Sequence, residues 1–311
     1  MTWDIIPDIH GQADKLTGLL TKLGYAERRG VWRHSNPSRT IIYLGGFIDR
    51  GPENAKVIRI VRSMIDAGTA QAVLGNHELN AIHFHTRHYK TGQPLRAHSA
   101  KNLKQHASFL TEHAIGSETA RDAISWMQTL PLFLELEEFR AVHACWSDAS
   151  IQTVSEVLLD GRLSEDAIQW SADTHHSLHR AIETLTKGPE EPLPEGCWFT
   201  DTSGHERNEV RLAWWKENAR TWKDIAISVP DAENQLPNAN LPPSISAETY
   251  LASSEPVFFG HYWMQGEVVM QAPNALCLDY SARLDGPLVS YQMEPGSGLL
   301  SLKNLTVCKL D

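Results

Sequence analysis

The stretch that decides the fold is Tyr43–Pro52, which reads YLGGFIDRGP. It includes the end of an apolar run at residues 40–44, which predicts a buried strand, and it precedes a helical pattern, because proline suits the first turn of a helix. Two shorter pieces, Asp8–Gly11 (DIHG) and Gly75–Glu78 (GNHE), also stand between an apolar run and a helix-like segment. Since open α/β sheets bind ligands at the carboxyl ends of their strands, we expect the three pieces to meet at one edge.

The first 80 residues alternate strand-like and helix-like segments. Strands are expected to end near Ile6 and to span residues 40–44 and 71–74, and helices to span residues 13–23 and 52–68. This βαβαβ order predicts a parallel sheet covered by helices. Later strand-like runs predict a second sheet packed on the first, and they lie at residues 132–136, 139–143, 257–259, 268–271, 275–278 and 288–292. The expected fold class is α/β, an α+β sandwich of two packed mixed sheets flanked by helices.

We expect a single domain over residues 1–311 with two insertions, at about residues 81–120 and 147–255. The first insertion is polar and rich in histidine: His83, His85, His88, His98, His106 and His113. The second combines helix-like segments, a Pro/Glu/Gly linker and a tryptophan-rich piece, and we expect a helical cap or side lobe. Because loops over a rigid scaffold often carry specificity, substrate choice is expected to reside in these insertions.

The composition is that of a soluble globular protein, with 41% hydrophobic and 21% charged residues. A formal charge of -10 argues against a protein that coats duplex nucleic acid, but not against a phosphate substrate held by divalent cations. No apolar run is long enough to span a bilayer and the first residues lack a secretion-signal pattern, so no membrane association and a cytoplasmic location are expected. The cysteines show no CxxC pair and are interpreted as free thiols: Cys145, Cys197, Cys277 and Cys308.

Two further apolar runs end in a histidine, His143 and His261. Any one of these pieces has an ordinary explanation, such as a surface turn, a helix N-terminus or a buried core histidine. Together, in this order, the five pieces resemble the calcineurin-like metallophosphoesterase superfamily, and most closely its bacterial serine/threonine phosphoprotein phosphatase branch.

The resemblance implies two divalent metal ions. Manganese is the expected metal, with iron/zinc, magnesium, nickel or cobalt as alternatives. Asp8 and His10 would bind the first ion. Asn76, His143 and His261 would bind the second.

The same resemblance implies a hydrolytic mechanism without a covalent enzyme intermediate. Metal-bound hydroxide would attack the phosphorus, and His77, oriented by Asp49, would protonate the leaving oxygen. Arg50, together with Asn76 and His77, would bind the phosphate. Arg207 and Arg211 are candidates for a second phosphate-binding arginine, although nothing in the sequence singles them out.

Position 46 departs from the family pattern, Gly-Asp-x-x-Asp-Arg-Gly, in which the first Asp bridges both metals. Gly46 offers no ligand, so metal occupancy should fall and turnover should be weak or absent. An introduced inactivating substitution is favoured over a natural variant with one metal or none, because every other motif position is intact. Pro7, where the family usually has glycine, fixes the turn and removes no ligand.

Three functions remain open. The first is a phosphomonoesterase acting on phosphoserine, phosphothreonine or phosphotyrosine in proteins. The second is a dinucleoside tetraphosphate hydrolase of the symmetrical type, whose pattern differs at the residues aligned with Asp49 and Glu78. The third is a non-catalytic phosphate-binding protein, made conceivable by Gly46.

Overall fold

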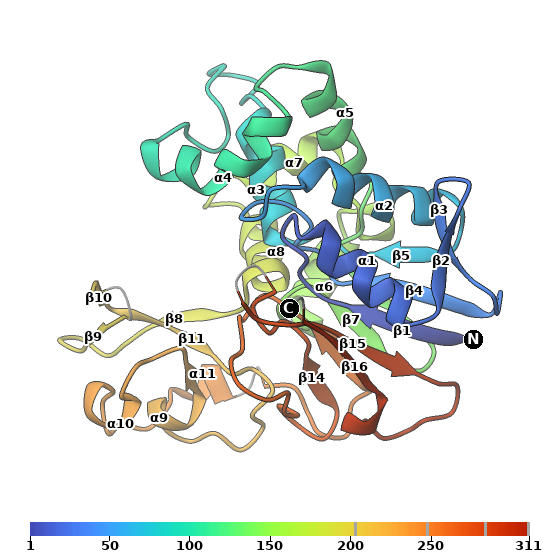
Figure 1. Cartoon of the computed structure of the whole chain (residues 1–311). Helices are drawn as coiled ribbons and strands as arrows, with labels where there is room; N and C mark the ends of the chain where they lie inside the picture. Colours follow the sequence, from blue (N-terminus) through green and yellow to red (C-terminus); the bar gives the residue numbers. More distant parts are fainter. Residues whose placement is uncertain (202–203, 247–248, 283–284, 310–311) are drawn as a thin grey trace.

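The computed structural model describes residues 1–201, 204–246, 249–282 and 285–309, and it contains two large sheets (Figure 1). The first has the strand order β16-β15-β1-β4-β5. Its strands are β1 (Thr2–Ile6), β4 (Arg39–Tyr43), β5 (Ala70–Ala72), β15 (Leu288–Met293) and β16 (Leu305–Cys308). As predicted, β1, β4 and β5 run parallel, whereas β15 pairs antiparallel with both β1 and β16.

The second sheet has the order β14-β13-β7-β6. Its strands are β6 (Phe133–Glu135), β7 (Arg140–Val142), β13 (Val257–Phe259) and β14 (Ala275–Cys277). Strand β13 is parallel to both β7 and β14, and β6 forms a hairpin with β7. The predicted fold class, two packed mixed sheets flanked by helices, is confirmed.

Two strand predictions were wrong in detail. Residues 268–271 form a loop, in which the Val269 N–H donates to the Tyr280 hydroxyl rather than to a neighbouring strand. Residues 288–292 were expected in the second sheet, but β15 joins the first sheet beside β1. An alternating apolar pattern identifies a half-buried strand, but not the strand with which it pairs.

The two sheets pack face to face through side chains that alternate along their strands. Trp3 and Ile5 of β1 point between the sheets and share a cluster with Phe139, Phe258 and Tyr291. Side chains on the opposite faces, together with the flanking helices, form a larger cluster. The strand ends are therefore fixed from both sides.

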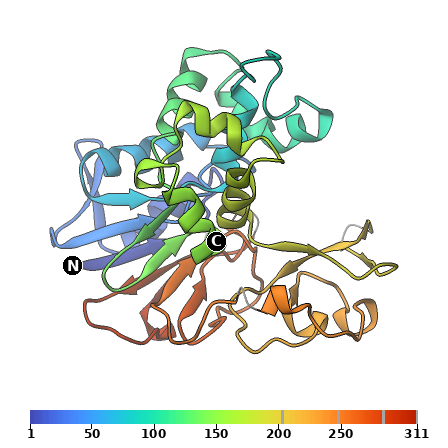
Figure 2. The same ribbon diagram turned by 180° about the vertical axis from the view of Figure 1, so that it is seen from behind.

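Helices cover the outer faces of both sheets (Figures 1 and 2). Helices α1 (Ala13–Lys22) and α2 (Asn54–Asp66) pack against the first sheet, next to the hairpin of β2 (Tyr25–Arg28) and β3 (Val31–His34). In Figure 1, α3 (Asn76–His85) and α4 (Ala100–Glu112) lie to their left and α5 (Glu118–Met127) lies above them. The second sheet is flanked by α6 (Asp148–Ser155), the 3₁₀ turn Leu159–Gly161, α7 (Glu165–Ser171) and α8 (Ser177–Lys187). A second 3₁₀ turn, Leu302–Asn304, precedes β16.

A side lobe follows α8 and carries its own small core around Val210 and Trp222. Its elements are β8 (Glu190–Pro192), β9 (Phe199–Thr200), β10 (Glu206–Arg207), β11 (Glu209–Leu212), α9 (Trp222–Ile225), β12 (Ala226–Ile227), α10 (Ala232–Gln235) and α11 (Pro243–Ser246). In Figure 2 the lobe lies at the lower right. The single domain and its insertion limits stay predictions. No helix in the described residues is long and apolar enough to cross a membrane.

Candidate active site

Five loops, each leaving the carboxyl end of a strand, hold the predicted site residues. They follow β1, β4, β5, β7 and β13, so both sheets contribute. Backbone hydrogen bonds join the loops: the N–H groups of Ile9 and His10 both donate to the Gly46 carbonyl at 2.8 Å, and the Gly260 N–H donates to the His143 carbonyl at 2.8 Å. The parallel register of neighbouring strands therefore brings residues far apart in sequence to one edge.

The predicted metal ligands lie close together at this edge, where the strands end. Asp8 Oδ1 lies 3.7 Å from His10 Nε2 and 3.8 Å from His143 Nε2. His143 Nε2 lies 3.0 Å from the amide oxygen of Asn76, and the His261 backbone N–H donates to Asp8 Oδ2 at 3.0 Å. The rings of His143 and His261 are 5.4 Å apart.

The donor set suits divalent cations. The Nδ1–H groups of His10 and His143 donate to the carbonyls of Ile48 and Leu44, so each Nε2 presents a lone pair to the site. His143 Nε2 and the Asn76 oxygen are both acceptors, and a cation between them would satisfy both. Among the described residues, His10 Nε2 and His261 Nε2 are buried without a hydrogen-bond partner.

Burial sets the charge of these ligands. It lowers the pKa of His143 to about 4 and holds the pKa of His10 and of His261 well below the ordinary value, so the imidazoles stay neutral at pH 7. Burial raises the pKa of Asp8 to about 7, against the opposing effect of the His261 N–H. In the described part of the chain, however, no group of three or more His, Cys, Asp or Glu side chains forms a closed metal site. One donor is the amide of Asn76, and position 46 lacks a carboxylate.

Gly46 lies directly beside Asp8, one of the predicted metal ligands, and offers no side chain. Its φ is +68°, and a Cβ built there would overlap Asp8 Oδ1 and lie 2.8 Å from Asp8 Cγ. The Asp8 carboxylate therefore occupies the space beside Gly46. Any side chain at position 46 requires Asp8 to turn away.

Glu78 fixes the loops rather than facing a ligand. This fully buried carboxylate accepts backbone N–H groups from Gly46 (2.9 Å), Phe47 (2.8 Å), Ile48 (3.4 Å) and Gly75 (3.1 Å). It ties the loop after β4 to the start of α3. A carboxylate that accepts several N–H groups is a strong, charge-assisted anchor.

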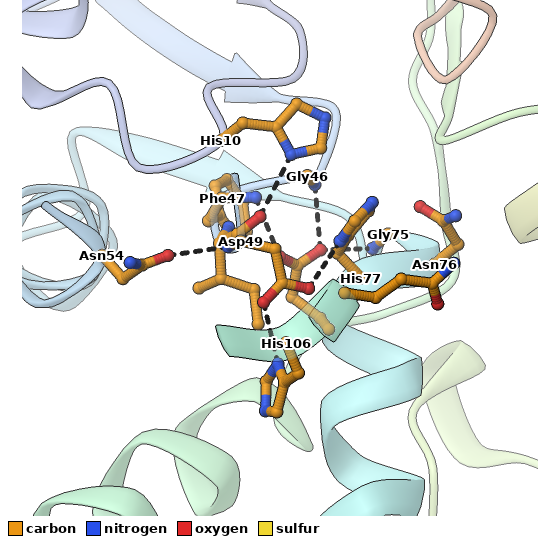
Figure 3. A network of polar contacts seen from close by, with 12 residues as sticks. His10, Gly46, Phe47, Asp49, Asn54, Gly75, Asn76, His77 and His106 are labelled. Atoms are coloured by element: carbon orange, nitrogen blue, oxygen red, sulfur yellow. Dashed lines mark hydrogen bonds and ion pairs between the residues drawn. The ribbon is translucent and has the colours of Figure 1, made fainter. Parts of the chain in front are cut away.

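Asp49 and His77 form the predicted pair. The His77 Nδ1–H donates to Asp49 Oδ2 at 2.6 Å, which leaves His77 Nε2 available for another partner (Figure 3). The exposed Arg50 follows Asp49, with its guanidinium carbon 5.7 Å from the centre of the Trp263 ring. The pair thus lies beside the ligand cluster, and the rings of His10 and His77 are 4.7 Å apart.

The sequence does not predict two other contacts of Asp49. His106 reaches its second carboxylate oxygen at 2.8 Å, and the Asn54 side-chain oxygen accepts the Asp49 N–H at 2.7 Å (Figure 3). His106 stood out only as one of six histidines in the first insertion. No local spacing connects it to a residue 57 positions earlier.

The two other candidate arginines have carboxylate partners in the side lobe. Arg207 donates to Asp201 at 2.9 Å and Arg211 to Glu190 at 2.8 Å. The pKa of His261 is low mainly because of burial and the neighbouring His143, and the charge of Arg211 adds a smaller contribution.

Comparisons with known proteins identify the family of this chain. A family model described as calcineurin-like phosphoesterase matches residues 1–230. The symmetrical bis(5'-nucleosyl)-tetraphosphatase of Janthinobacterium sp. (strain Marseille) is 24% identical over 310 residues, covering 94% of this chain and 93% of that protein. The asymmetrical bis(5'-nucleosyl)-tetraphosphatase PrpE of Bacillus velezensis is 34% identical over 135 residues, which are 43% of this chain and 51% of that protein. The aligned segment therefore spans about half the length of that relative.

A solved structure shows the same fold. A protein serine/threonine phosphatase from Saccharomyces cerevisiae superposes with a TM-score of 0.50 at 13% identity, covering 100% of this chain and 80% of that chain. At this identity the likeness concerns the fold alone. Because the family model covers most of the sequence, the chain belongs to the calcineurin-like phosphoesterase family.

Proposed function

We propose that this protein is a metal-dependent hydrolase of phosphate esters or anhydrides. The observation that carries the proposal is the Asp49–His77 hydrogen bond of 2.6 Å beside a cluster of neutral imidazoles. Asp8 and His10 would hold one cation, and Asn76, His143 and His261 a second. When bound, such cations lower the pKa of water and so supply a nucleophile near neutral pH.

The protein's own groups would bind the substrate and handle its protons. Arg50 would hold the phosphate through its guanidinium fork, with Asn76 and His77 beside it. The Asp49 carboxylate would fix the His77 ring with Nε2 toward the leaving oxygen, and His77 would give that oxygen its proton. Arg211 would add positive charge if it released Glu190.

Two substrate classes are supported by different observations. Dinucleoside tetraphosphates are favoured by the names of two relatives, one of which aligns with nearly the whole chain. Phosphomonoesters, including phosphoproteins, are favoured by the Asp49–His77 pair, because their leaving alcohols have a high pKa and need a general acid to protonate the departing oxygen. Glu78 does not decide between them, because its carboxylate is used to fix backbone loops.

Gly46 would impair the activity. Without a bridging carboxylate the two cations lack a shared neutralising ligand, so at least one should bind weakly. We therefore expect low turnover from this chain and higher turnover from Gly46→Asp. Manganese is the first metal to test.

The experiment measures phosphate release by both forms during a manganese titration, with an aryl phosphate, a phosphopeptide and diadenosine tetraphosphate. His77→Asn should abolish turnover, whereas His175→Asn, a change at an exposed histidine, should leave it intact. If Gly46→Asp binds manganese but hydrolyses none of the three substrates, the enzyme proposal fails. The preferred substrate then follows from kcat/KM.

A further inference from the structure

We propose that helix α4, within the first insertion, is a positioning element for Asp49, acting through His106 on its carboxylate and through Glu112 on its backbone. The helix contributes no group to the predicted metal ligands. Its contacts instead converge on the residue that orients His77. The inference rests on the proposed function only in what Asp49 does for catalysis.

The side-chain contact encloses the carboxylate from two sides. His77 donates to Oδ2 at 2.6 Å and His106 to Oδ1 at 2.8 Å, while Asp49 is 4% exposed. Burial alone would raise the pKa of Asp49, but the hydrogen bonds from His106 and His77 hold it well below its usual range. With both oxygens engaged, rotation of the carboxylate is restrained.

The ring of His106 is itself oriented. Its face stacks on Phe109, with ring centres 4.6 Å apart, and its Nε2 lies 3.3 Å from His85 Nε2. Because Asp49 only accepts, His106 carries its proton on Nδ1 and can accept from His85 through Nε2. Burial lowers the pKa of His85 to about 4, so His85 is neutral and has one N–H to donate.

The second contact reaches the Asp49 backbone. The Glu112 carboxylate accepts the N–H of Asn54 at 2.6 Å and that of Ala55 at 3.1 Å, at the start of α2. It also accepts the Asn54 side-chain N–H at 2.8 Å, while the Asn54 oxygen accepts the Asp49 N–H at 2.7 Å. Asp49 has a φ of +68°, a conformation that a side-chain-bearing residue adopts at a cost. The two contacts of α4 therefore support both the side chain and the strained backbone of Asp49.

The test compares His106→Leu and His106→Gln, with His113→Leu as the matched control. His113 lies at the end of the same helix and stacks on Phe109 at the same 4.6 Å, so its loss imitates the change in packing. Each variant is made in Gly46→Asp and in the unaltered chain. We expect His106→Leu to lower kcat about tenfold to a hundredfold with KM nearly unchanged, as is typical for residues that orient a catalytic group through a hydrogen bond. His106→Gln, which can still donate to Asp49, should recover most of that loss.

A second readout does not depend on activity. The short His77–Asp49 hydrogen bond should give a downfield proton resonance, assigned by its loss in His77→Asn and recorded without manganese. His106→Leu should weaken or shift this signal, and His113→Leu should not. If His106→Leu misfolds, Glu112→Gln, which weakens only the backbone contact, should cause a smaller change in the same signal.

The possible outcomes are distinct. An unchanged signal and unchanged kcat in a folded His106→Leu protein would overturn the positioning role. Equal losses in His106→Leu and His113→Leu would also overturn it, because packing alone would explain them. If no form hydrolyses any substrate while the signal responds as expected, the positioning role stands and the proposed function fails.

Discussion

Gly46→Asp should make the metal-free protein less stable, and manganese should restore much of the lost stability. The residue has a φ of +68°, and a Cβ there would overlap the Asp8 carboxylate. In the absence of metal, Asp8 must turn away and release the His261 N–H, which it now accepts at 3.0 Å. With cations present, both carboxylates gain partners.

The expected magnitude follows from these contacts. A side chain in the left-handed region costs roughly 1–2 kcal/mol. Loss of the buried, charged hydrogen bond from His261 to Asp8 costs about 1.5–3 kcal/mol. The metal-free variant should therefore be destabilised by about 2.5–5 kcal/mol, which lowers its melting temperature by several degrees. Manganese at 100 times its Kd should restore about 2.7 kcal/mol.

The assay is thermal unfolding with and without manganese, combined with calorimetric titration of the metal. Gly68→Asp is the matched control, because Gly68 also has a φ of +68° but has open space around its Cβ position. It should lose only the backbone contribution, about 1–2 kcal/mol, and should leave manganese affinity unchanged. Gly46→Asp should bind manganese at least about 100-fold more tightly than the unaltered chain.

The reasoning would be refuted by either of two results. One is a metal-free Gly46→Asp protein as stable as Gly68→Asp, because Asp8 would then not occupy the space beside position 46. The other is unchanged manganese affinity, because the missing ligand would then not limit metal binding.

Three further changes have expected outcomes. Glu78→Gln should lower the free energy of unfolding by about 2–4 kcal/mol, because a buried carboxylate that accepts several backbone N–H groups loses its charge. Arg39→Met should cost about 3–5 kcal/mol, since Arg39 is bidentate to the fully buried Asp4 at 2.6 and 2.8 Å and its removal leaves that charge without its cationic partner. His83→Gln should reduce the loss of stability at acid pH, because burial lowers the pKa of His83 to about 3 in the folded protein. In the unaltered chain the unfolded state takes up a proton on His83 below about pH 6.5 and the folded state does not, so the free energy of unfolding falls by at most about 1.4 kcal/mol per pH unit below that pH.

Urea unfolding measures the first two changes, and their controls are Glu137→Gln and Arg121→Met, both at exposed positions. A loss below about 1 kcal/mol for Glu78→Gln or Arg39→Met, as expected of surface pairs, would contradict the roles given to these buried groups. For His83, unfolding is followed from pH 7 to pH 4 in both proteins. Parallel curves would show that the His83 ring is not held neutral by the fold.

The sequence by itself determined the site loops. Each piece follows an apolar run, and parallel strands end at a common edge, so proximity of Asp8, Asn76 and His143 followed from local pattern and a general rule of α/β sheets. The Asp-Arg-Gly and Gly-Asn-His-Glu pieces indicated the calcineurin-like family. Position 46 was noticeable because it has glycine where the family pattern has an aspartate. Local spacing was sufficient to identify each of these pieces, because the residues within one piece lie together at the end of a single strand.

Only the tertiary structure decided how these loops are held. The Asp8 carboxylate fills the space beside Gly46, and Glu78 accepts backbone N–H groups from two loops. His106, in helix α4, donates to Asp49 in the loop after β4. Strand β15 likewise joined the first sheet rather than the second. Apolar periodicity indicates which face of a helix or strand is buried. The contacts described here depend on which other helix or strand covers that face, and this is decided by the packing of the whole chain.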